Sequence, residues 1–387
     1  MLLKLQKPTN SNEMKYRLLL AIAFTLILNS ASSAQIVTTT ISKFDSLSNL
    51  GYKMTLREKD LFSDNIYTDT LKTYIDISNN KELFRIEGTK ISEVYDGSKL
   101  IKMDLHNHTY QIQSRIEAST LQYKSLPYII SSLKKDLYKN VPILIHNDSI
   151  LNGKKYFHIK ITEIDTIKNN KRIYRFVKML IDKESYLPIY YKSDQQGFID
   201  GTDMFVDTYS EMYFYDYETN KEDFSELSSF VVPSNFTIEK PKEQKPLLAE
   251  GIKAPKLDLE DMYGEIFQLK NQKGKVVLLN FTSNSCPHSV ESVSMLNDLY
   301  STYQKRKFTI ITINPFDNKE AVEKYNKKGN IKYPVFTNIG THNTENYNVD
   351  NYPTFYLIDK NGNIIKGFNG YQKSLDADLN SLIRKHL

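Results

Sequence analysis

Apolar and polar residues alternate through much of the segment 35–236, which is the pattern of β-strands with one buried face. Turn residues separate the alternating runs. Asp96–Gly97, for example, lies between the runs 91–95 and 100–103 and predicts a tight hairpin. Further hairpins are predicted between 73–77 and 83–86, between 157–161 and 174–177, and between 178–183 and 187–191. We therefore expect an antiparallel, β-rich domain over 35–236.

One stretch in this region has apolar residues at helical spacing. It runs from Pro127 to Tyr138, and its proline falls in the first turn, where a helix tolerates it. The domain is therefore predicted to be α+β, with helices placed against the sheet. The segment 180–183 followed by 187–190 is similar to part of the LolA/LolB-like lipoprotein-carrier fold. That resemblance implies a curved, incompletely closed antiparallel sheet around a hydrophobic cavity, and hence a hydrophobic ligand. A generic antiparallel sheet fits the pattern about as well.

The pattern changes after a polar, proline-bearing stretch, so we assign 237–250 as a linker. Short apolar runs at 276–281 and 308–313 predict strands buried on both faces. Helices are predicted over 287–305, 320–328 and 376–386, and a hairpin over 353–365. The result is a βαβ unit followed by a ββα unit, which predicts an α/β domain over 251–387.

The beginning of the chain has the parts of a secretory signal peptide. Lys15 and Arg17 precede the apolar run 18–28, and small residues fill 30–34. We expect a signal over 1–34, cleaved after Ala34, and a protein exported to the periplasm or cell envelope. The alternative is an uncleaved segment that tethers the protein to the membrane.

Charge and cysteine content narrow the function classes. The net charge is only +5 over 387 residues and the two signs are mixed, so nucleic acid is not an expected partner. The chain has one cysteine, Cys286, and so cannot form an internal disulfide. That thiol is a buried structural group, a link between two chains, or a reactive group.

Three features around Cys286 favour reactivity. The cysteine follows the strand 275–281 and begins a helix, where unpaired backbone N–H groups stabilise a thiolate. His288 follows two positions later and could stabilise the same charge. Tyr352–Pro353 stands just before a strand, a natural place for a cis peptide bond. The alternatives are an inert buried cysteine, a surface histidine without a role and an ordinary trans proline.

The residues of this region resemble the TlpA/ResA family of exported thioredoxin-like proteins. The resemblance rests on 274–281, the cysteine motif, 349–359 and the lead-in 251–255. It implies a thioredoxin-like fold whose active site is a Cys-x-x-Cys motif at a helix N-terminus, facing a cis-proline loop. Cys286, His288 and Pro353 would then be the catalytic residues, and their motif neighbours would be Pro287, Ser289 and Tyr352.

This sequence departs from the family pattern at two positions. Ser285 replaces the usual tryptophan, and Ser289 replaces the second cysteine. The inner pair Pro287–His288 is similar to that of the oxidising DsbA-type proteins, in which the attacking cysteine is acidic. A serine hydroxyl cannot resolve a mixed disulfide, so a dithiol cycle within one chain is excluded.

The leading hypothesis is therefore a monothiol thiol–disulfide oxidoreductase of the cell envelope. Its partners would be envelope proteins that carry disulfides or oxidised thiols, together with an external resolving thiol. A second hypothesis is a redox-inactive, chaperone-like module that binds peptide or lipid. The weakest is a one-cysteine peroxidase: Ser283 lies three residues before Cys286, as a hydroxyl residue does in peroxiredoxins, but Leu279 stands where a proline is expected.

No cofactor is expected, because the sequence has no glycine-rich phosphate loop, and no metal site is expected either. His106 and His108 would share one face of a strand and could ligate a metal. No further ligand lies near them in the sequence, so we interpret them as an unoccupied surface pair.

Overall fold

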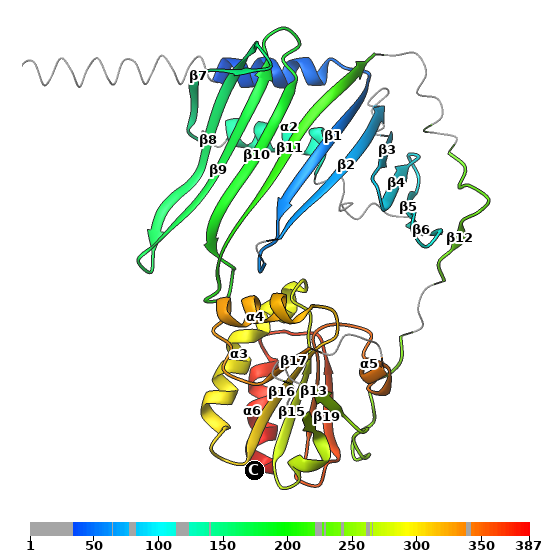
Figure 1. Cartoon of the computed structure of the whole chain (residues 1–387), viewed down its shortest axis with the longest axis vertical. Coiled ribbons are helices and arrows are strands. Elements are labelled where there is room, and N and C mark those ends of the chain that lie inside the picture. Colours follow the sequence, from blue (N-terminus) through cyan, green and yellow to red (C-terminus); the bar gives the residue numbers. More distant parts are fainter. Residues whose placement is uncertain are drawn as a thin grey trace, which may run out of the picture. The chain divides into compact units, whose positions relative to one another are not determined.

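The computed structural model describes residues 34–387 except 64, 77–82, 114–123, 139–140, 221–226, 228–229, 241–243, 261–263, 265 and 338–341 (Figure 1). The described residues form two compact units. The first takes in the chain up to Lys59, Ile66–Gln196 and Thr208–Lys240, and the second takes in Asp60–Asn65, Gly197–Asp207 and Pro241–Leu387. Apart from Ala34, the predicted export signal lies outside the described residues.

The first unit contains a twelve-stranded sheet in the order β12-β6-β5-β4-β3-β2-β1-β11-β10-β9-β8-β7. Its strands are β1 (Asn49–Lys59), β2 (Ile66–Asp76), β3 (Leu83–Glu87), β4 (Ile91–Tyr95), β5 (Leu100–Asp104), β6 (Thr109–Gln113), β7 (Ile143–Leu151), β8 (Lys154–Lys168), β9 (Lys171–Asp182), β10 (Pro188–Phe198), β11 (Phe205–Thr219) and β12 (Thr237–Ile238). Strands β7 to β10 pair antiparallel in sequence order, as do β1 to β6. The predicted hairpins are confirmed.

The alternation in β1 shows why these residues form a sheet with a core on one face. Leu50, Tyr52 and Met54 are buried at every second position, while Lys53 between them points outward to Asp216, with 2.9 Å between Nζ and the carboxylate. Helix α2 (Leu126–Tyr138) packs on the buried face through positions spaced three and four apart: Leu126, Ile129, Ile130 and Leu133. The predicted helix is confirmed with its start one residue earlier.

The second unit is an α/β unit with a five-stranded sheet in the order β17-β16-β15-β18-β19 and a separate hairpin, β13-β14. Its elements are β13 (Asp258–Glu260), β14 (Ile266–Gln268), the 3-10 helix η4 (Leu269–Gln272), β15 (Val276–Phe281), α3 (Pro287–Tyr303), β16 (Phe308–Asn314), α4 (Lys319–Lys328), β17 (Val335–Thr337), α5 (His342–Asn346), β18 (Thr354–Ile358), β19 (Ile364–Asn369) and α6 (Leu375–His386). The predicted βαβ and ββα order is confirmed, and the fold is thioredoxin-like.

Strand β15 lies at the centre of this sheet and every one of its residues is buried. Two apolar clusters explain this, one on each face of the sheet. On one face, α3 and α6 contribute Leu296, Leu299 and Leu379 (Figure 1). On the other face, the lead-in residues Leu257 and Leu259 pack with Tyr347. A continuous apolar run is what a strand covered on both sides requires.

The predicted linker, 237–250, contains ordered chain at both ends. Thr237–Ile238 forms β12 and pairs in parallel with β6 in the first unit. Leu247 and Leu248 pack against the core of the second unit, and the Leu248 N–H donates to the Tyr356 hydroxyl over 3.2 Å. The described residues at each end of the predicted linker therefore belong to the two compact units.

In the described part of the chain, no helix is long and apolar enough to cross a bilayer.

The Tyr356 hydroxyl should contribute measurably to the stability of the second unit. It donates to the Tyr347 carbonyl over 2.6 Å and accepts from Leu248 N–H, and its side chain is buried. Tyr356→Phe removes both bonds and should lower the free energy of unfolding by about 1–3 kcal/mol. Differential scanning calorimetry would show this as a lower melting temperature. Tyr300→Phe is the control, because no described residue bonds to that hydroxyl; an equal loss there would contradict the prediction.

Candidate functional site

Cys286 lies between the end of the central strand β15 and the first residue of helix α3. The cysteine is the N-cap of α3, with extended backbone angles and Pro287 as the first helical residue. Its carbonyl accepts from Val290 N–H over 3.1 Å, which begins the helix. The residue is partly exposed. The unpaired N–H groups of the first turn of α3 therefore lie at the same end of the helix as the sulfur.

The start of β18 forms the second wall of the site. The Cys286 thiol donates to the Tyr352 carbonyl over 3.1 Å, and the Tyr352–Pro353 peptide bond is cis. Strand β18 begins at the next residue, Thr354, which pairs with Phe281 at the end of β15. The antiparallel pairing of these strands therefore brings the proline loop to the sulfur. A peptide that approaches the sulfur would meet the backbone of this loop.

The other motif residues lie on α3 in different surroundings. The His288 side chain is 63% exposed and its Nδ1 lies 3.2 Å from Glu291 Oε2, so the ring pairs with its own helix surface. Among the described residues, no hydrogen bond joins it to the sulfur. Ser289 is buried, and its hydroxyl accepts from Ser283 N–H over 3.4 Å. The position of the missing second cysteine thus lies inside the helix–loop junction.

A buried polar network holds the cysteine loop, and the sequence analysis missed it. The Asn314 side chain donates to Asn284 Oδ1 over 3.0 Å and to Asp317 Oδ2 over 2.8 Å. The same Asp317 oxygen accepts from Asn284 N–H over 3.2 Å. Asn314 ends β16 and Asn284 follows β15, and these strands are parallel neighbours. A polar residue close to the end of each of two buried strands was the available signal.

The same network presents an exposed aromatic residue, Phe316. Asn314 Oδ1 accepts from Phe316 N–H over 3.0 Å, which holds the turn in place. The Phe316 ring is 58% exposed and meets Tyr352 edge-on, with 4.9 Å between ring centres. The Tyr352 carbonyl accepts a hydrogen bond from the Cys286 thiol, so the Phe316 and Tyr352 rings form an apolar surface beside the sulfur. We call Phe316 and Tyr352 the aromatic ledge.

Tyr325 of α4 interacts electrostatically with Cys286 and Asp317. Its side chain is buried, and its hydroxyl has no hydrogen-bond partner in the described part of the chain. Burial raises the pKa of Tyr325 well above its ordinary value, and negative charge on Cys286 and Asp317 raises this pKa further. The phenol therefore stays protonated.

Ser283 does not take the role that a peroxidase would need. Its hydroxyl lies 2.9 Å from the Ser285 hydroxyl, and its carbonyl accepts from Cys286 N–H over 3.2 Å. The serine therefore positions the backbone of the cysteine loop, while its side chain bonds to its neighbour instead of the sulfur.

The described residues contain no cluster of three or more metal-ligating side chains. The expectation that His106 and His108 share a strand face is wrong. Both lie in the turn between β5 and β6, where Asp104 Oδ1 accepts from His106 N–H over 2.9 Å. His108 has a positive φ of 52°, and its ring packs on Phe236.

The first unit, for which the carrier resemblance implies a hydrophobic ligand, contains a cavity of about 380 Å³ beside α2. Its lining includes two ion pairs. Lys124 bonds to Glu58, and Arg175 lies 3.2 Å from Glu163. Covering these charges with an acyl chain would cost their hydration, so this cavity suits a polar ligand better than an apolar one.

Comparison with known proteins places these observations in a family. The model of the AhpC/TSA family matches residues 251–366. The thiol-disulfide oxidoreductase ResA of a Bacillus cereus strain is 33% identical over 131 residues, which cover 34% of this chain and 75% of that protein. ResA of Geobacillus kaustophilus is 30% identical over 149 residues, which cover 38% of this chain and 83% of that protein.

A solved structure with similarity is that of a thiol:disulfide interchange protein of the thioredoxin family from Chlorobium tepidum TLS. It is 24% identical, covers 36% of this chain and 97% of its own, and has a TM-score of 0.33. Three observations indicate the same family: the sequence matches to ResA, the strand order of the second unit and the cysteine at the start of α3. Through this region, the chain belongs to the family of ResA-type thiol-disulfide oxidoreductases.

Proposed function

We propose that this protein is an exported thiol–disulfide oxidoreductase of the cell envelope that works through one thiol, Cys286. The contact between its sulfur and the carbonyl that precedes Pro353 carries the proposal. It sets the thiol at a helix N-terminus and against a backbone edge that a substrate strand can pair with. Pro287 and Ser289 shape the first turn of the helix, and His288 adds a titratable group at its surface.

The chemistry follows from the single sulfur. The Cys286 thiolate attacks one sulfur of a substrate disulfide, so a new S–S bond forms, the substrate S–S bond breaks, and the leaving thiolate takes up a proton. An external thiol then attacks the substrate sulfur of this mixed disulfide, which frees Cys286 and joins the external thiol to the substrate. A second external thiol attacks that bond, releases the reduced substrate and leaves with the first as a disulfide. The two external thiols thereby supply the two electrons.

The partners proposed for this reaction are envelope proteins that carry a disulfide or an oxidised thiol. A low-molecular-weight or protein thiol must complete each cycle, because Ser289 offers a hydroxyl where a resolving thiol would be needed. The mixed disulfide should therefore persist until that outside thiol arrives.

A second candidate is a redox-inactive module that binds peptide. The aromatic ledge favours it, because an exposed phenylalanine packed on the half-buried Tyr352 can contact a peptide without any exchange of disulfides. Cysteine chemistry separates the two functions, since binding by the ledge does not require Cys286.

Restoring the second cysteine should change the outcome of the exchange. The natural protein should accumulate mixed disulfides and reduce insulin only slowly, because each turnover waits for outside thiols. Ser289→Cys should shorten the lifetime of these adducts and raise the rate of insulin reduction, because the new thiol can attack the mixed disulfide from within. Non-reducing gels of alkylated extracts and an insulin-reduction assay would measure both effects.

Two variants serve as controls for this experiment. Cys286→Ala should abolish the adducts, and Ser301→Cys, at an exposed position near the end of α3, should leave them unchanged. If the natural protein forms no adducts and Ser289→Cys gains no activity, thiol exchange is excluded and the peptide-binding module is favoured.

The aromatic ledge should matter for peptide substrates and not for small disulfides. Phe316→Ala should lower kcat/KM for a disulfide-linked peptide about threefold to tenfold, the size of a lost aromatic contact. Its reaction with oxidised glutathione should change little. Phe316→Tyr should restore the peptide rate, and Ile266→Ala, at an exposed residue of β14, is the matched control. Equal losses with both substrates would show that Phe316 acts on the sulfur and not on recognition.

A further inference from the structure

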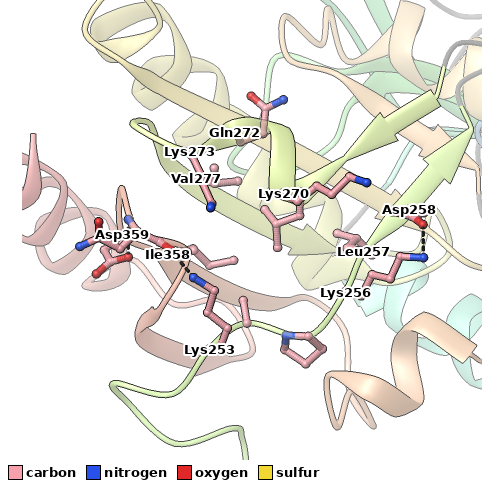
Figure 2. A pocket seen from close by; sticks show the side chains of 15 residues that line it. Lys253, Lys256, Leu257, Asp258, Lys270, Gln272, Lys273, Val277, Ile358 and Asp359 are labelled. Carbon is pink, nitrogen blue, oxygen red and sulfur yellow. Dashed lines mark hydrogen bonds and ion pairs between the residues drawn. The ribbon is translucent and has the colours of Figure 1, made fainter.

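A second pocket lies in the thioredoxin-like unit, away from Cys286 (Figure 2). It has a volume of about 220 Å³ and is bounded by the lead-in segment, η4, the start of β15 and the turn between β18 and β19. Val277 at the start of β15 lines it, whereas Cys286 follows the other end of the same strand. The two places are therefore separated by most of the length of β15.

The floor of this pocket is apolar. Leu257, Val277 and Ile358 line it and are buried, at 0%, 1% and 1% exposure, and Leu269 adds a fourth aliphatic side chain. None of these side chains has a polar atom. A ligand that reaches the floor must therefore present hydrocarbon to it, because an unpaired polar group there would lose its hydration without compensation.

The rim of the pocket is cationic. Four lysines line it, Lys253, Lys256, Lys270 and Lys273, against two carboxylates, Asp258 and Asp359. Both carboxylates are already engaged. Asp258 lies 2.7 Å from Lys256 Nζ, and Asp359 Oδ1 accepts from the N–H groups of Asn361 and Asn363, each over 2.8 Å. Four positive against two negative groups leave a net charge of +2 at the rim.

The remaining lysines are available to an anion. Among the described residues, Lys270 and Lys273 have no ion-pair partner, and Lys253 donates to the Asn361 carbonyl. Figure 2 shows the ammonium ends of Lys253 and Lys273 toward Asp359, and the Lys256–Asp258 pair at the opposite side of the pocket. Gly362 makes room for this arrangement, because a Cβ there would lie 3.1 Å from Lys253 Nζ.

We propose that this pocket binds a small monocarboxylate with an apolar tail, the tail on the aliphatic floor and the carboxylate beside Lys253 and Lys273. The charge of the rim excludes a cation, and the apolar floor excludes a fully polar anion such as free phosphate. The volume sets the length of the tail. At about 30 Å³ for a group the size of water, 220 Å³ holds about seven such groups, so a tail of at most about seven carbons fits below a carboxylate held at the rim.

Isothermal titration calorimetry of the purified protein with sodium octanoate tests this proposal. Binding should saturate at one ligand per chain and weaken as salt is added. From butanoate to octanoate, each added methylene should tighten binding about fourfold until the floor is covered. Octanol, which has the chain without the charge, should bind at least about fivefold more weakly than octanoate at low ionic strength.

Variants locate the site. The double variant Lys253→Gln/Lys273→Gln should lower octanoate affinity about fivefold or more, and Lys327→Gln, at an exposed position of α4, should leave it unchanged. Ala254→Leu, which adds bulk to the pocket wall, should prevent binding while the melting temperature without ligand is retained. Should Ala254→Leu fold poorly, the lysine variants decide alone.

Two results would overturn the proposal. One is the absence of saturable octanoate binding at millimolar concentration. The other is equal binding of octanoate and octanol with no effect of the lysine variants, which would indicate nonspecific apolar association. Neither result bears on thiol exchange, since the measurement does not use Cys286.

Discussion

The pairing of β18 with β15 is the interaction on which the candidate active site depends. Cys286 follows one strand and Pro353 precedes the other, and these segments are more than sixty residues apart in the sequence. Antiparallel pairing of Phe281 with Thr354 puts the two ends at the same edge of the sheet. The hydrogen bond from the thiol to the Tyr352 carbonyl is then a consequence of strand register. Alternate residues of β15 pack into two different apolar clusters, so a shift of one residue would exchange the side chains that the clusters receive.

Local patterns were sufficient to predict the long elements of the second unit, because each has a strong signal in its own residues, whereas the short elements β13, β14, η4, β17 and α5 were missed. The run 276–281 is entirely apolar apart from Asn280, and α3 begins with a proline directly after its N-cap. The family resemblance added the pairing of the cysteine with the proline loop. In the first unit, alternation predicted the hairpins but not the order of twelve strands, since β1 pairs with β11 across more than 150 residues.

The features that were missed depend on contacts between distant residues. Asn284, Asn314 and Asp317 are ordinary polar residues in the sequence, and only the parallel pairing of β15 with β16 brings their side chains together. His288 was assigned to the sulfur because it is close in sequence. At the second helical position after the N-cap, however, the ring meets Glu291 one turn later, which is the usual i, i+3 neighbour on a helix surface. The lysines of the second pocket come from the segment 253–273, and none of them belongs to a recognisable motif.

Because the second cysteine is absent, the partners of this chain determine how long the mixed disulfide of the proposed reaction lasts. In a dithiol protein, the second sulfur limits the lifetime of every mixed disulfide, whether or not the substrate is well bound. With Ser289 buried in its place, release depends on an outside thiol reaching the mixed disulfide. A substrate that covers Cys286 also slows its own release, so the fit between substrate and protein determines the lifetime of the adduct. Phe316 and Tyr352 are held beside the sulfur and matter for this reason. Contacts with them that strengthen substrate binding also lengthen the lifetime of the mixed disulfide.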